Sequence, residues 1–209
     1  MNIPKPLTQA ALHELKYHTH YRLQNFYPVE LLDLIRRKWR DLPMNHVVRT
    51  YNLFHVERYQ TKEDLEILQA MTEFTYSFGL TSQLHCVYRY HEGSFARLHS
   101  DMPGVITFVT LLEPNTAVGG DAIILDKHRI TIDSGYHDAD GKVPDNIEKH
   151  EIIEPREILY MDLVPRILPL RNVDETLFYP TPSKTKHGVT PVESGERVVL
   201  IHWMTEPKT

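Results

Sequence analysis

Hydrophobic positions at helical spacing dominate the first part of the chain. In residues 27–43, YPVELLDLIRRKWRDLP, the apolar side chains recur every three or four residues. Pro28 favours a first helical turn, and Pro43 favours the end of the helix. The spacing predicts a helix whose buried face carries Leu31, Leu32, Ile35, Trp39 and Leu42.

A second helix is predicted over residues 61–79. Thr61 and Asp64 have the spacing of a capping box at its start, and Gly79 is a natural residue for its end. The apolar positions expected along it are Leu65, Leu68, Met71 and Phe78.

The period changes from helical to alternating after Gly79. In residues 83–90, Leu84, Cys86, Tyr88 and Tyr90 should share one face of a strand, with His85, Val87 and Arg89 on the other. We expect Cys86 to be a buried, inert thiol. Further strands are predicted over residues 104–114, 120–126, 128–133, 150–162 and 196–204. Helices in front and strands behind indicate a mostly β protein with flanking α, as a sandwich or barrel with the helices packed outside.

Composition limits the classes of protein that fit. The chain has 209 residues, a net charge of −5 and one cysteine, so a disulfide within the chain is impossible and a reducing, cytoplasmic setting is expected. No linker divides it, and we predict a single domain, 1–209, with a helical support region over 1–80 and a catalytic core over 81–205. No stretch is long and apolar enough for a membrane span, so no membrane partner is expected. The oligomeric state is left open.

Two charged segments each allow an ordinary and a functional interpretation. The basic residues Arg36, Arg37, Lys38 and Arg40 lie mostly off the apolar face; a solvated face is favoured over a patch for an acidic partner. The acidic balance means that nucleic acid is not expected as a partner. Residues 138–141, DADG, lack the full ligand pattern of a calcium loop and are interpreted as an exposed turn.

The candidate chemistry lies in residues 96–104, ARLHSDMPG. At a strand end, His99 and Asp101 would point to the same side and offer an imidazole and a carboxylate to one metal ion. His187 can supply a third ligand, which gives the facial triad of non-haem Fe(II) oxygenases. Ten residues later, Arg197 can pair with the distal carboxylate of a keto acid. Alternation predicts that Arg197, Val199, Ile201 and Trp203 share a face.

Four segments in order resemble the prolyl 4-hydroxylase-type branch of the Fe(II)- and 2-oxoglutarate-dependent dioxygenases. They are VYRYHEGSFARLHSD, GGDAIILD, EPREILYMD and KHGVTPVESGERVVLIHW, and the resemblance covers roughly residues 84 to 204. It implies a double-stranded β-helix, a relative of the jelly roll. It also implies His99, Asp101 and His187 as iron ligands, with Arg197 and Tyr90 binding 2-oxoglutarate. Tyr90 has an equal alternative as a core aromatic residue.

The resemblance further implies an activity and its cofactors. Fe(II) would act with 2-oxoglutarate and O₂ as co-substrates, with ascorbate as an optional reductant, to hydroxylate an unactivated C–H bond and release succinate and CO₂. The first expectation for the substrate is a prolyl or other amino-acid residue of a protein or peptide. The alternatives are a free amino acid, another small molecule or a nucleobase. A different class, a non-catalytic jelly-roll binding protein, also stays open.

Two departures from the family pattern stand out. Many relatives have serine or threonine two residues after the basic residue, where this chain has Val199. Thr107 and Thr110 are candidates to replace that hydroxyl, although alternation places them on opposite faces, so at most one fits. Residues 127–157 make a long connection, which is either an active-site lid or a surface excursion. The remaining histidines, including His20, are expected to be surface or packed side chains.

Overall fold

The computed structural model describes residues 20–48, 53–77, 79–99, 101, 105–126, 166–180 and 185–205. Its helical elements are α2 (Val29–Lys38), α3 (Leu65–Ser77) and two short 3₁₀ turns, η1 (Trp39–Asp41) and η2 (Thr61–Glu63). The first strands are β1 (Tyr21–Gln24), β2 (Met44–Val48), β3 (Leu53–Phe54), β4 (Val56–Tyr59), β5 (Thr81–His91), β6 (Phe95–His99) and β7 (Val105–Leu111). The later strands are β8 (Val118–Gly119), β9 (Ala122–Asp126), β10 (Arg166–Leu168), β11 (Glu175–Pro180), β12 (Thr185–Val189), β13 (Val192–Ser194) and β14 (Glu196–Thr205).

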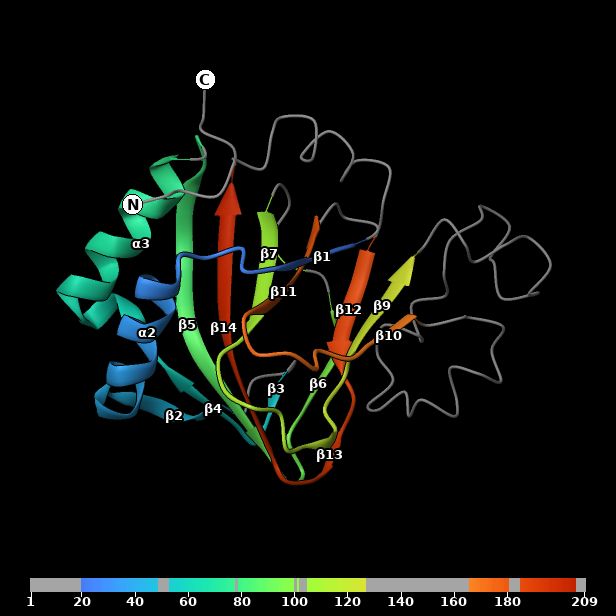
Figure 1. The fold of residues 1–209 in the computed structure, drawn as a ribbon. Coiled ribbons are helices and arrows are strands. Elements are labelled where there is room, and N and C mark those ends of the chain that lie inside the picture. Colours follow the sequence, from blue (N-terminus) through green and yellow to red (C-terminus); the bar gives the residue numbers. More distant parts are fainter. Residues whose placement is uncertain are drawn as a thin grey trace.

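Two antiparallel sheets form the core of the molecule. The larger has the order β1-β11-β7-β14-β5-β4-β2 and the smaller the order β10-β9-β12-β6-β3, while β13 pairs with β8. Figure 1 shows the larger sheet between the helices and the smaller sheet, with α2 and α3 on the outside. The predicted fold class, mostly β with flanking helices, is confirmed.

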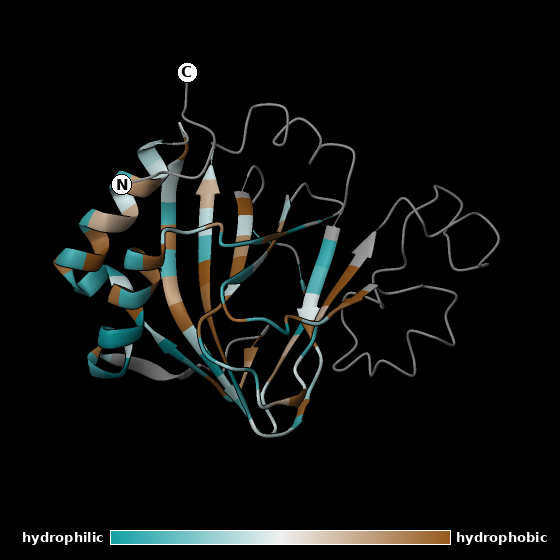
Figure 2. Ribbon diagram, in the orientation of Figure 1, coloured by the Kyte–Doolittle hydropathy of each residue, from teal (hydrophilic) through white to brown (hydrophobic). Residues whose placement is uncertain are grey.

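The long strands β5 and β14 have two buried faces. Cys86, Tyr88 and Val199 point into the cluster between the two sheets. Val87 and Leu200 point into the other cluster, under the helices. Both alternations match the predicted faces. Figure 2 shows hydrophobic residues gathered along the strands, whereas the helices carry both hydrophilic and hydrophobic residues.

The first helix packs as the sequence predicts. Leu31, Leu32, Ile35, Trp39 and Leu42 are all buried, although the α-helix ends at Lys38 and η1 carries Trp39. This face packs against the outer side of the larger sheet, where it meets residues such as Phe108 and Phe178. The helix therefore covers apolar surface that the sheet alone would leave in water.

The second helix differs from the prediction in its buried stripe and its cap. Leu65 is 79% exposed and Leu68 is 36% exposed, and the buried stripe is Ile67, Met71, Phe74 and Thr75. The cap is Asp64, whose Oδ1 accepts hydrogen bonds from the backbone N–H groups of residues 66 and 67. Thr61 instead lies buried against β5. At the far end, Gly79 has φ +66° and donates to the Tyr76 carbonyl, as predicted for that glycine.

The described part of residues 1–80 contains strands as well as the predicted helices. This region also contributes β1, β2 and β4 to the larger sheet and β3 to the smaller one. These strands are two to five residues long, and a segment this short does not show a recognisable alternation of apolar and polar residues. The division into a support region and a catalytic core stays a prediction.

Several predicted segments lie outside the described residues. They include the strands over 128–133 and 150–162, the DADG turn and the long connection over 127–157. Among the described residues, no helix is long and apolar enough to span a membrane.

Candidate metal centre

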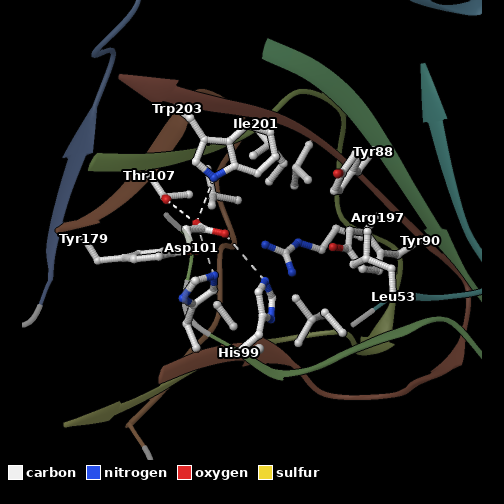
Figure 3. Close-up of a pocket in the computed structure, with 17 residues that line it drawn as sticks. Leu53, Tyr88, Tyr90, His99, Asp101, Thr107, Tyr179, Arg197, Ile201 and Trp203 are labelled. Carbon is white, nitrogen blue, oxygen red and sulfur yellow. Dashed lines mark hydrogen bonds and ion pairs between the residues drawn. The ribbon is translucent and has the colours of Figure 1, made fainter. Parts of the chain in front are cut away.

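His99, Asp101 and His187 converge on one point between the two sheets. His99 is the last residue of β6, and it pairs directly with His187 of β12 across the smaller sheet. Asp101 follows two residues after His99, and its carboxylate lies 3.7 Å from His99 Nε2 and 3.4 Å from His187 Nε2. The ligand atoms of the three side chains all lie within 4.8 Å of one another. Figure 3 shows His99 and Asp101 close together at one side of the pocket.

The two imidazoles present Nε2 toward the aspartate. His99 Nδ1 lies 2.6 Å from the Arg97 carbonyl oxygen, so Nδ1 donates, and Nε2 is the ring nitrogen that faces Asp101. Burial, with a smaller contribution from His99, lowers the pKa of His187 to about 3. His187 is therefore neutral at physiological pH and can act as a ligand.

Gly188 allows β12 to approach β6 closely beside the second histidine. A Cβ atom at this position would lie 2.7 Å from the Ala96 carbonyl oxygen, which is a backbone atom that has little freedom to move. A glycine here thus sets the distance between the two ligand-bearing strands. The Tyr179 ring, centred 4.7 Å from the His187 ring, packs against this histidine.

The Asp101 carboxylate is held from the opposite sheet. Its Oδ2 accepts a hydrogen bond of 2.5 Å from the Thr107 hydroxyl and one of 2.8 Å from the Trp203 indole N–H. Both bonds appear as dashed lines in Figure 3.

Arg197 points into the same pocket. It is 2% exposed, and Figure 3 shows its guanidinium directed toward His99 and Asp101. Burial lowers its pKa, yet arginine remains a cation in proteins. One amino group donates to the Gly120 carbonyl oxygen, whereas the buried Nε has no hydrogen-bond partner. A buried cation with an unused donor is suited to receive an anionic ligand.

Tyr90 lies beside this arginine. The Arg197 guanidinium carbon lies 5.8 Å from the centroid of the Tyr90 ring, and burial raises the pKa of the Tyr90 hydroxyl. Tyr90 is thus both a buried core aromatic residue and a pocket residue.

Thr107 and Thr110, the candidates to replace the hydroxyl missing at Val199, lie on opposite faces of the sheet. Thr107 faces the pocket, but its hydroxyl donates its hydrogen bond to Asp101. Thr110 faces the other side and bonds to Thr176. Neither donates to an anion beside Arg197 in this arrangement.

The chemistry of the donor set fits Fe(II). Two imidazoles and one carboxylate form a facial triad, which leaves open coordination positions for a co-substrate and O₂. Of the described residues, no other group of three or more histidine, cysteine or acidic side chains comes together in this way.

The other titratable clusters have structural partners. His85 and His202 are buried, packed side chains, as predicted. In the basic cluster, Arg36 pairs with Asp33 and Asp174, Lys38 pairs with Asp64 and Glu66, and Arg40 pairs with Glu113. Three of its four residues therefore pair with acidic groups of the same chain, which favours the ordinary interpretation.

No family model matches the sequence, and no curated protein shows significant similarity to it. Solved structures do match. A prolyl hydroxylase from Trichoplax adhaerens, in complex with a peptide of a hypoxia inducible factor, has a TM-score of 0.62 at 12% identity, covering 96% of this chain and 89% of that one. A Pseudomonas putida prolyl-4-hydroxylase has a TM-score of 0.59 at 18% identity, with coverages of 97% and 100%. HygX from Streptomyces hygroscopicus, with nickel and 2-oxoglutarate bound, has a TM-score of 0.66 at 10% identity, with coverages of 95% and 87%.

These similarities establish the fold. The chain has the fold of 2OG-Fe(II) oxygenases, among them prolyl hydroxylases, and the predicted double-stranded β-helix is confirmed. The identities are too low to carry over an activity, and the site itself has to support one.

The sequence did not indicate the partners of the aspartate. Thr107 was a candidate for a different role, and Trp203 was predicted only to share the face of Arg197. Thr107 lies 6 positions and Trp203 lies 102 positions after Asp101, and both belong to the opposite sheet. No local sequence pattern encodes such contacts.

Proposed function

We propose that the protein is an Fe(II)- and 2-oxoglutarate-dependent dioxygenase that hydroxylates an unactivated C–H bond. The observation that carries the proposal is the convergence of His99, Asp101 and His187 on one point, with the buried cation of Arg197 on the same pocket. A fold shared with 2OG-Fe(II) oxygenases supports it.

Each proposed residue has one task. His99, Asp101 and His187 hold the iron, with His99 fixed in its tautomer by the Arg97 carbonyl. Arg197 binds the distal carboxylate of 2-oxoglutarate, and Tyr90 packs beside that carboxylate. When bound, the iron and 2-oxoglutarate supply the oxidation by O₂, with release of succinate and CO₂. The protein orients these groups and excludes water, and no side chain is required as a general base.

The pocket limits how much of a substrate enters. Its volume is about 70 Å³, and its lining includes apolar side chains such as Leu53, Val109 and Ile201. Pockets that enclose a whole drug-sized ligand measure roughly 300–1,000 Å³. A pocket of this size does not enclose a whole drug-sized substrate.

The first candidate substrate is a prolyl or other amino-acid residue of a protein or peptide. It is supported by the Trichoplax prolyl hydroxylase, which is in complex with a peptide. The second candidate is a small molecule, supported by HygX, a structure of which has hygromycin B bound. Both candidates use the same site.

Succinate formation tests the proposal. Protein supplied with Fe(II), 2-oxoglutarate and O₂ is incubated with prolyl peptides and with free amino acids, and succinate and hydroxylated products are measured by mass spectrometry. We expect iron-dependent succinate that rises with the correct substrate and is lost in His187→Ala. His20→Ala is the matched control and keeps full activity. Metal and 2-oxoglutarate binding with no succinate under any condition would instead identify a binding protein.

A further inference from the structure

The aspartate of the metal centre belongs to one sheet and is held by the other. Asp101 follows β6 of the smaller sheet, while Thr107 lies on β7 and Trp203 on β14 of the larger sheet. Thr107 and Trp203 are directly opposite each other in the pairing of those two strands. Two neighbouring side chains on the inner face therefore reach across the core to one carboxylate oxygen.

The two hydrogen bonds make the two oxygens of the carboxylate inequivalent. Oδ2 accepts from both the Thr107 hydroxyl and the Trp203 indole. The other oxygen, Oδ1, accepts neither of these bonds and lies 3.7 Å from His99 Nε2, while Oδ2 lies 3.4 Å from His187 Nε2. An oxygen that already accepts two hydrogen bonds is a poor metal ligand, because its lone pairs are in use.

We propose that Thr107 and Trp203 are positioning residues that reserve Oδ1 of Asp101 for the metal ion. This inference rests on the proposed function. Held in this way, the carboxylate supplies one ligand atom, and the positions needed by 2-oxoglutarate and O₂ stay open. Without the two donors it can rotate and bind through both oxygens, at the expense of the co-substrate. The side chains act through Asp101 and contact no reacting atom.

The hydroxyl of Thr107 is tested by a matched set of three variants. Thr107→Val removes the donor at constant shape, Thr107→Ser keeps it, and Thr110→Val removes a buried threonine hydroxyl from the opposite face of the same strand. Fe(II) affinity and the 2-oxoglutarate affinity of the iron-loaded protein are measured without O₂ by calorimetry. We expect Thr107→Val to weaken binding of 2-oxoglutarate to the iron-loaded protein about 10- to 100-fold, the usual size of effect on losing an outer partner of a metal ligand. Thr107→Ser and Thr110→Val should stay within about threefold of the unmodified protein.

The indole of Trp203 provides a second and independent readout. The sequence has two tryptophans, and Trp39 donates a similar hydrogen bond to Glu113 far from the site. Trp39→Phe leaves Trp203 as the only tryptophan, and Fe(II) should change its fluorescence with the same saturation curve as the calorimetric titration. Trp203→Phe should abolish that signal and weaken 2-oxoglutarate binding about tenfold or more, whereas Trp39→Phe should bind 2-oxoglutarate normally.

The outcomes separate this inference from the proposed function. If the unmodified protein binds iron and 2-oxoglutarate, and Thr107→Val and Trp203→Phe bind 2-oxoglutarate as tightly as it does, the positioning role is wrong and the proposed function stands. If the unmodified protein binds no iron, the proposed function fails and this inference fails with it.

Discussion

Removal of the Arg197 side chain should weaken binding of 2-oxoglutarate steeply. In the structure Arg197 is 2% exposed and has an unused buried donor on a pocket that also holds the three proposed metal ligands. Arg197→Ala would leave the distal carboxylate in that pocket without its cation. Loss of one member of a buried charge pair costs about 3–5 kcal/mol, which corresponds to an affinity loss of roughly a hundred- to a few-thousand-fold.

The assay is a titration of 2-oxoglutarate against the iron-loaded protein without O₂, alongside the apparent KM in the succinate assay. Iron affinity should be nearly unchanged. Arg197→Lys should recover part of the loss, because a lysine still attracts the carboxylate but cannot make two parallel hydrogen bonds.

Arg89→Ala is the matched control for this prediction. Arg89 lies on the neighbouring strand, is partly exposed and pairs with Glu196, the residue next to Arg197. An exposed ion pair contributes at most about 1 kcal/mol, so its loss should leave 2-oxoglutarate binding unaffected. Equal 2-oxoglutarate affinity in Arg197→Ala and Arg89→Ala would refute the role of Arg197 and put 2-oxoglutarate itself in doubt as the co-substrate.

Three further predictions test the packing around the site and the core. Gly188→Ala should push β12 away from β6, because the added Cβ would meet the Ala96 carbonyl. Thermal unfolding should show a loss of stability of about 1–3 kcal/mol, and calorimetry should show weaker iron binding. Unchanged iron affinity would show that the close approach of the two strands does not position His187. Burial lowers the pKa of His85 to about 4 and that of His202 well below its usual value, so below pH 6.5 the unfolded chain binds more protons than the folded protein does. The free energy of unfolding should therefore fall by roughly 1 kcal/mol per histidine between pH 7.5 and 5.5. A His85→Gln variant that retains the full pH dependence would contradict this. Cys86 is 1% exposed and burial raises its pKa to about 12, so thiol reagents should label it only after unfolding, and rapid labelling of the native protein would show that Cys86 is not buried.

The parts of the fold that the sequence predicted are those with long, regular patterns. The strands β5 and β14 have eleven and ten residues, and their alternation specifies two distinct buried faces. The strands β3, β8 and β13 have only two or three residues and offer no pattern. The sequence of β12, TKHGV, lacks the apolar pattern of a buried strand. Its inward residue is the candidate ligand His187, and the next residue is Gly188, which allows the close approach to β6.

The second helix shows where local pattern and tertiary packing diverge. Leu65 and Leu68 fit a helical stripe as well as Ile67 and Phe74 do. The choice depends on which stripe meets the sheet, and the Asp64 cap and the contacts of the helix with β5 set that rotation. Periodicity alone does not distinguish two competing stripes on one helix.

The candidate ligands were accessible from the sequence because their spacing and order follow a family pattern. His99 and Asp101 are two positions apart, and His187 pairs with His99 across the smaller sheet. Thr107 and Trp203 were missed in their roles because the two sheets bring them to Asp101 only after folding.

The most direct test of the central claim is a crystal structure of the protein grown without O₂ in the presence of Fe(II) and 2-oxoglutarate. We expect one iron ion bound by His99 Nε2, Asp101 Oδ1 and His187 Nε2, with the distal carboxylate of 2-oxoglutarate on Arg197. Iron bound elsewhere, or 2-oxoglutarate bound away from Arg197, would contradict the proposed catalytic site.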